Sequence, residues 1–196
     1  MYYNRILEQT IIKTSKTFPV VLVTGPRQVG KTTLLTKMAE ESRTIVSLDN
    51  PTVRGLAKED PELFLQRYKP PVLIDEVQYA PELFPYIKMY VDKHKNSGDF
   101  WLTGSQAFQM MENITESLAG RVGIVRLNGL SNAEIQQTFH KEFVVDMEQL
   151  IKRRESSKEM DAAEVFHRIY KGSMPRLYEN TEVDLEQYYE SYIETY

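Results

Sequence analysis

Residues 20–41 of the chain read VVLVTGPRQVGKTTLLTKMAEE. An uninterrupted apolar run over residues 20–24 stops at Gly25, and further on Lys31 stands between a glycine and a threonine where a helix-compatible segment begins. A continuous run rich in β-branched valine predicts a strand that is covered on both faces, as in a parallel sheet. A buried strand, a glycine-containing turn and a helix in this order are the context that a phosphate-binding loop requires.

The turn itself fits the P-loop (Walker A) pattern G-x-x-x-x-G-K-[ST]. The chain must leave a strand, curl around a phosphate and enter a helix, so backbone N–H groups point at the anion. We expect Lys31 to reach the β- and γ-phosphates and the Thr32 hydroxyl to ligate Mg²⁺, which prefers oxygen ligands. The alternative is a glycine turn with a solvated lysine. The predicted nucleotide-binding residues are Gly25, Pro26, Arg27, Gln28, Val29, Gly30, Lys31, Thr32 and Thr33.

Two acidic residues, Asp75 and Glu76, directly follow a second short apolar run in VLIDEV. An acidic residue at a strand end is the second metal-site element (Walker B) of a P-loop domain. We therefore expect Asp75 to hold Mg²⁺ through water and Glu76 to polarise the attacking water as a catalytic residue. The alternative is a pair of surface carboxylates that cap the next segment.

Strand-like and helix-like segments alternate along the first two thirds of the chain, which predicts an α/β domain. Beyond Leu130 the pattern becomes helical and charged, with KRRESSKEMD either a loop or a solvated helix face. We expect a nucleotide-binding core over residues 1–130 and a helical lid over residues 131–196. The final amphipathic segment ends without a stopping residue, so we also expect the chain to be a fragment of a longer protein.

Composition excludes several other classes of protein. The chain has 196 residues, a net charge of -4, no cysteine and three widely separated histidines. Disulfides and thiolate metal sites are therefore excluded, and the charge gives no global attraction to nucleic acid. No apolar run approaches the roughly 20 residues of a membrane helix, and the polar start lacks a signal-peptide core. We expect a cytoplasmic protein that does not associate with membranes.

Four motifs in this order, at suitable spacing, carry a resemblance to a known family. They are TGPRQVGKTTL, LIDEVQ, LTGSQAF and SLAGRV, at residues 24–34, 73–78, 102–108 and 117–122. Together they resemble AAA-type ATPases of bacteria and archaea that are related to the STAND and archaeal ATPases. Such proteins usually carry a C-terminal domain of unknown function. The resemblance covers about residues 1–180.

The resemblance implies a P-loop NTPase core with five parallel strands in the order 5-1-4-3-2, flanked by helices and followed by a helical lid. It also implies adenine rather than guanine as the base, so that ATP with Mg²⁺ is the expected ligand. By the same resemblance, Ser105, with Thr103 as the alternative, is expected to sense the γ-phosphate. Arg121 occupies the position of an arginine finger, which would act on a neighbouring subunit; the alternative is a structural arginine paired with a local carboxylate such as Glu116.

The leading functional hypothesis is a Mg-dependent ATPase that couples ATP binding and hydrolysis to conformational change. One alternative is a small-molecule or nucleotide kinase, in which Arg153 and Arg154 would belong to a closing lid. Another is a nucleotide-binding scaffold with little turnover. The partners left open are a second copy of the chain in a homo-oligomer, and a protein or DNA bound through a C-terminal region beyond the printed chain.

Overall fold

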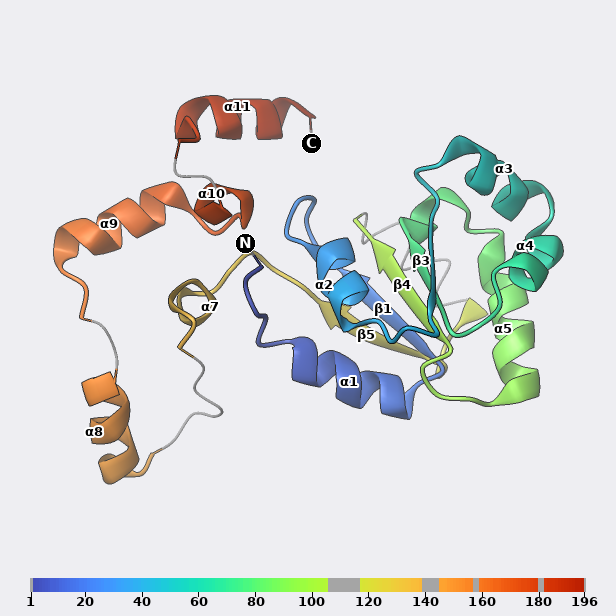
Figure 1. Cartoon of the computed structure of the whole chain (residues 1–196), viewed down its shortest axis with the longest axis horizontal. Helices are drawn as coiled ribbons and strands as arrows, with labels where there is room; N and C mark the ends of the chain where they lie inside the picture. Colours follow the sequence, from blue (N-terminus) through green and yellow to red (C-terminus); the bar gives the residue numbers. More distant parts are fainter. Residues whose placement is uncertain (1, 106–116, 139–144, 157–158, 180–181, 196) are drawn as a thin grey trace. The chain divides into compact units, whose positions relative to one another are not determined.

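Residues 2–105, 117–138, 145–156, 159–179 and 182–195 are described by a computed structural model (Figure 1). The strands are β1 (Val20–Thr24), β2 (Thr44–Ser47), β3 (Val72–Asp75), β4 (Phe100–Gly104) and β5 (Val122–Arg126). The helices that accompany them are α1 (Glu8–Thr17), α2 (Lys31–Met38), α3 (Pro51–Glu59), α4 (Pro61–Arg67), the short 3-10 helix η1 (Val77–Tyr79) and α5 (Leu83–His94). The later helices are α7 (Asn132–Gln136), α8 (Met147–Ser156), α9 (Ala162–Lys171), α10 (Arg176–Glu179) and α11 (Leu185–Thr195).

The five strands form one parallel sheet in the order β2-β3-β4-β1-β5. Read from the other edge this is 5-1-4-3-2, so the expected α/β P-loop fold is confirmed. β1 lies between β4 and β5, with Val20 in register with Phe100 and Val122. The carboxyl ends of all five strands therefore meet at one edge of the sheet, which is the edge where Gly25 and Glu76 leave their strands.

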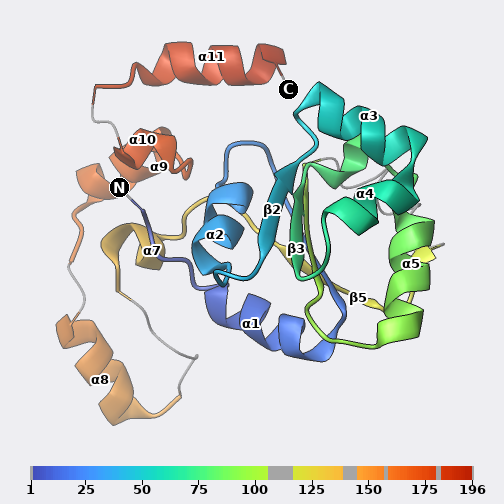
Figure 2. The same cartoon turned by 45° about the vertical axis from the view of Figure 1, so that its right-hand side comes forward.

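The sheet is covered on both faces, which explains its uninterrupted apolar runs. Figures 1 and 2 show α1 and α2 on one side of the sheet and α3, α4 and α5 on the other. Every residue of β1, β3 and β4 is buried. Alternate residues of these strands pack with Phe64, Phe84 and Ile87 in one apolar core. Because both faces are dry, the sequence shows no polar alternation in these strands.

Helix α5 ends at His94, because Lys95 adopts a left-handed conformation and its N–H donates to the Val91 carbonyl. Gly98 lies beyond the helix, in a turn against Ser15. The charged segment KRRESSKEMD begins inside α8, so its first half is a helix face rather than a loop. A helix is also predicted from the sequence over residues 107–118, which lie mostly outside the described residues.

The chain divides into two compact units, Leu7–Asn128 on one side and Met1–Ile6 together with Gly129–Tyr196 on the other. The first unit is the sheet with its covering helices. The division of function into a core over 1–130 and a lid over 131–196 stays a prediction. None of the described helices combines the length and the apolar composition that crossing a membrane requires.

In the second unit, the first residues of the chain bind α7. Glu134 closes a capping box with Ser131 at the start of α7. Its carboxylate also pairs with Arg5 at 3.1 Å and accepts the Ile6 N–H at 2.8 Å. The side chains of Arg5 and Glu134 are only 5% and 6% exposed. The second unit is thus joined across the length of the sequence by a buried ion pair.

Candidate functional site

Two glycines give the loop after β1 its shape. Gly25 has φ 151, and a Cβ atom added there would lie 2.0 Å from the Leu127 carbonyl oxygen. Gly30 has φ 90 and forms the N-cap of α2. At Gly25 the close approach of the Leu127 backbone excludes any side chain. At Gly30 the left-handed conformation disfavours one. The spacing of the two glycines in the motif therefore follows from the backbone path.

The loop delivers the amino end of α2 to the carboxyl edge of the sheet. The first bond inside this helix runs from the Leu34 N–H to the Gly30 carbonyl, so the N–H groups of Lys31, Thr32 and Thr33 have no acceptor within the helix. No acidic side chain lies in its first turn. Amide donors and the positive end of the helix dipole together favour a bound anion here.

Lys31 bends back over the loop. Its Nζ donates to the Gly25 carbonyl at 3.0 Å and to the Pro26 carbonyl at 2.8 Å, and the residue is 5% exposed. Burial lowers the pKa of Lys31, while the negative charges of Glu76 and Asp75 oppose that shift. A cation held by neutral carbonyls in a partly dry site can exchange them for phosphate oxygens, which bind it more strongly.

Thr32 and Asp75 meet across the gap between α2 and β3. The Thr32 hydroxyl donates to Asp75 Oδ1 at 2.6 Å, and the Thr103 hydroxyl donates to the same oxygen at 2.6 Å. Ser47 donates to the other carboxylate oxygen at 3.3 Å. These four residues come from α2, β2, β3 and β4, and the sheet order brings them together.

This set of oxygens fits Mg²⁺. A hydroxyl and a carboxylate in contact are the ligands this ion accepts when phosphate oxygens and water complete its shell. Among the described residues no group of three or more histidine, cysteine or acidic side chains could form an all-protein metal cage. Thr32 and Asp75 are the residues that would hold the ion. When bound, Mg²⁺ would neutralise charge on the β- and γ-phosphates.

Glu76 is held at both its backbone and its side chain. It has φ 57 and ψ 47, a left-handed conformation that costs a residue other than glycine about 1–2 kcal/mol. Its N–H donates to the Thr103 hydroxyl at 3.0 Å, so Thr103 bridges the two acidic residues. Its carboxylate accepts the Ser105 hydroxyl at 3.3 Å and a hydrogen bond from the Gln78 amide. Strained backbone of this kind is typical of functional sites.

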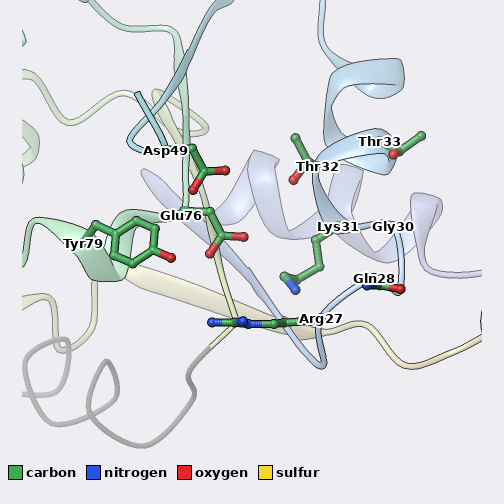
Figure 3. A pocket seen from close by; sticks show the side chains of 9 residues that line it. All are labelled: Arg27, Gln28, Gly30, Lys31, Thr32, Thr33, Asp49, Glu76 and Tyr79. Atoms are coloured by element: carbon green, nitrogen blue, oxygen red, sulfur yellow. The ribbon is translucent and has the colours of Figure 1, made fainter. Parts of the chain in front are cut away.

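These groups open onto a cleft of about 440 Å³. Its lining residues are Arg27, Gln28, Gly30, Lys31, Thr32, Thr33, Asp49, Glu76 and Tyr79. Figure 3 shows the loop residues on one side of this cleft and Asp49, Glu76 and Tyr79 on the other, with the Glu76 carboxylate turned toward Lys31. The cleft thus combines the anion-binding loop with the acid pair.

Sequence reasoning did not include Asp49 and Tyr79 in the site. Asp49 follows β2 at the carboxyl edge of the sheet. A polar residue directly after a strand is the sequence signal that could have identified it. Tyr79 lies in η1 with the Arg54 guanidinium 5.2 Å from its ring centroid, and no local pattern marked it.

Arg121 is not brought to this cleft. It precedes β5, and its carbonyl accepts the Val20 N–H at the amino edge of the sheet, a strand length of about 13 Å from the loop. Its guanidinium forms a two-pronged ion pair with Asp92 of α5, at 2.5 and 3.0 Å. The local carboxylate partner is therefore Asp92, and Glu116 lies outside the described residues. The arginine-finger role stays a prediction that requires a second copy of the chain.

The fold and the cleft define a P-loop domain of the nucleotide-binding class. A family model described as an AAA domain matches residues 17–136, which is more than half of the chain. The chain belongs to this family of AAA-type ATPases. The expected family is therefore confirmed.

The chain is also similar to two curated proteins and to several solved structures. Two uncharacterized proteins, from Mycobacterium tuberculosis and Mycobacterium bovis, are each 40% identical over 119 residues, 60% of this chain but 26% of the relative. A Walker-type ATPase of Pyrococcus abyssi superposes with a TM-score of 0.57 at 18% identity, over 99% of this chain and 72% of its own. DnaA from Aquifex aeolicus, solved with AMPPCP bound, superposes with a TM-score of 0.51 at 12% identity, over 89% of this chain and 57% of its own. At these identities the structural matches establish the fold.

Proposed function

We propose that this chain binds ATP with Mg²⁺ and hydrolyses it. The observation that carries the proposal is the 2.6 Å hydrogen bond between Thr32, at the end of the phosphate loop, and Asp75, at the end of β3. It joins the phosphate loop to the end of β3, although the two residues lie far apart in sequence, and this contact supports a magnesium-nucleotide site between them. An AAA-type fold supports ATP as the nucleotide.

The phosphate loop and the acid pair have distinct roles in this proposal. The amides of Lys31, Thr32 and Thr33 bind phosphate oxygens, and the Lys31 side chain adds a positive charge. Thr32 and Asp75 hold the ion. Glu76 accepts a proton from water as the water oxygen bonds to the γ-phosphorus, and the bond from that phosphorus to the bridging oxygen of ADP breaks.

Glu76 favours hydrolysis over the kinase alternative. A kinase uses a hydroxyl of its substrate as the nucleophile, whereas a carboxylate fixed in the cleft can activate water directly. We further infer that the second unit responds to the nucleotide as a lid, because the chain passes between the units at only two points, Ile6–Leu7 and Asn128–Gly129. Ordering of a segment by a γ-phosphate is an established form of switching.

The test uses two substitutions in the full chain. Lys31→Ala should abolish Mg-ATP binding in calorimetry, because it removes the buried cation that faces the phosphates. Glu76→Gln should retain binding and lower turnover by about 10²- to 10⁴-fold, the range for loss of a general base.

Lys37→Ala is the matched control, since Lys37 is an exposed lysine on the same helix. It should bind ATP as the unmodified chain does. Equal ATP affinity in the Lys31→Ala and Lys37→Ala proteins would contradict the proposal. Transfer of phosphate to an added small-molecule acceptor, with none released to water, would favour the kinase alternative.

A further inference from the structure

Gln78 is the residue of LIDEVQ to which the site gives no role. It lies in η1, one residue beyond Val77 and two before Ala80, both of which are fully buried. The turn is closed by the Tyr79 N–H, which donates to the Glu76 carbonyl at 3.1 Å. The backbone that carries Gln78 is therefore fixed by the core directly below the acid pair.

The Gln78 amide donates to two groups of the site at once. Its Nε2 donates to Glu76 Oε2 and, at 3.3 Å, to Ser105 Oγ. The Ser105 hydroxyl donates to the same Glu76 oxygen, at 3.3 Å. Both donors thus converge on one oxygen of the Glu76 carboxylate. Within the part of the chain that the structure describes, no hydrogen bond reaches the other oxygen, Oε1.

The acceptor end of the Gln78 amide is poorly satisfied. Its Oε1 is buried and has no hydrogen-bond partner among the described residues. Burying an unpaired amide oxygen is unfavourable, so stability alone would favour an apolar side chain of the same size at this position. The contribution of the glutamine is therefore its N–H donors, and these are directed at Glu76 and Ser105.

We propose that Gln78 is a positioning residue for the hydrolytic step. It holds Oε2 of Glu76, so that Oε1 faces the cleft and accepts the hydrogen of the attacking water. This inference rests on the proposed ATPase function and assigns a new residue to it. Thr103 fixes the Glu76 backbone, while Gln78 and Ser105 fix its carboxylate. A base held at both ends reaches the water in one orientation, and misplacement of such groups is costly to turnover.

The first test is Gln78→Met in the full chain, a change that keeps the length of the side chain and removes its donors. We expect kcat for ATP to fall about ten- to hundredfold, with KM and calorimetric ATP affinity unchanged. Gln66→Met, on an exposed position of α4, is the matched control and should leave all three quantities unchanged. Equal denaturation midpoints, followed by Trp101 fluorescence, will show that both variants are folded.

Combining Gln78→Met with Glu76→Gln separates this inference from the proposed function. If Gln78 acts through Glu76, the double variant should turn over no more slowly than Glu76→Gln alone. A further loss in the double variant, or a Gln78→Met protein within twofold of the unmodified kcat while Glu76→Gln is inactive, would overturn the inference and leave the ATPase intact. If the unmodified chain and Glu76→Gln release phosphate equally, the proposed function fails, and this inference with it.

Discussion

The two compact units of this chain are stabilised by different kinds of interaction. In the unit Leu7–Asn128, parallel strands and their covering helices bury a continuous apolar core. In the second unit, α9 and α11 contain no buried residue at all. Its buried apolar side chains among the described residues are Leu130 and Leu177. Polar contacts accompany them: the Arg5–Glu134 ion pair, the helix caps, and tyrosine hydroxyls that donate to carbonyls.

This difference predicts which kind of substitution destabilises each unit. An apolar core distributes its stability over many side chains, each worth about 1.5–3 kcal/mol when fully buried. A unit with few buried side chains depends on a small number of directional contacts, whose loss leaves unpaired groups behind. Loss of an apolar side chain should therefore damage the first unit, and loss of a charge the second.

The largest expected difference in stability is between two phenylalanine-to-alanine substitutions, one in each unit. Phe84 in α5 is 0% exposed, whereas Phe166 in α9 is 71% exposed. Phe84→Ala should lower the free energy of unfolding by about 3–5 kcal/mol, because it leaves a cavity in the core. Phe166→Ala should change it by no more than about 0.5 kcal/mol. Urea denaturation, followed by circular dichroism and by the fluorescence of Trp101 in β4, measures both.

Trp101 is the only tryptophan of the chain and reports on the sheet unit. Comparable losses of unfolding free energy in the two phenylalanine variants would contradict the proposed difference between the units. They would mean that the exposed face of α9 is as well packed as the sheet core.

A second comparison removes one carboxylate from a buried and from an exposed ion pair. The buried pair is Arg5–Glu134, and the exposed pair is Arg154–Glu159, whose side chains are 82% and 84% exposed. Glu134→Gln should destabilise the second unit by about 3 kcal/mol, because the buried Arg5 loses the carboxylate charge opposite it. Glu159→Gln should cost less than about 1 kcal/mol.

Amide hydrogen exchange in α7 is the appropriate measurement, because the second unit has no tryptophan. Protection that is unchanged by Glu134→Gln would show that apolar contacts, rather than the ion pair, hold α7. The Trp101 signal should respond to neither variant.

The smallest expected effect is a dependence on pH. Burial tends to raise the pKa of Glu134, but N–H donors from Ser131 and Ile6 and the charge of Arg5 outweigh it, so the pKa lies below its ordinary value of 4.5. The unfolded chain then binds the proton more readily than the folded chain. The contribution to stability is complete above the ordinary pKa and is lost as the pH falls through the folded value.

We therefore expect the exchange protection of α7 to decline on acidification from about pH 5 to about pH 4. The decline should be smaller than the effect of Glu134→Gln, because only part of the carboxylate is protonated in that range. In the Glu134→Gln variant, the part of the decline that comes from protonation of Glu134 should be absent. A decline of the same size in both proteins would assign it to other groups.

Most of the sheet unit was predictable from the sequence, because its signals are local. The apolar run over 20–24 indicated a strand covered on both faces, and β1 is buried throughout. An aspartate directly before a proline is a local signal for the start of a helix, and the Asp60 side chain accepts the Leu63 N–H at 2.9 Å. The phosphate loop was identified for the same reason, since its glycines and its lysine follow one another in a single turn.

The rest of the site could not be predicted in this way, because its contacts join separate elements. The pairing of Arg121 with Asp92 connects the start of β5 to α5. The convergence of Gln78 and Ser105 on Glu76 depends on β3 and β4 being neighbours. The grouping of the first residues with α7 rests on a contact across 129 positions of sequence. No periodicity or motif encodes such distances.

The class of fold, the phosphate loop and the acid pair after β3 were predictable from local signals, because hydrophobic period, glycine geometry and strand ends act over a few neighbouring residues. The folded molecule was needed to show that Thr32 touches Asp75, that Gln78 binds Glu76, and that Arg121 lies at the opposite edge of the sheet. These facts follow from the order in which parallel strands assemble, and that order is set by the packing of the whole core rather than by any single segment.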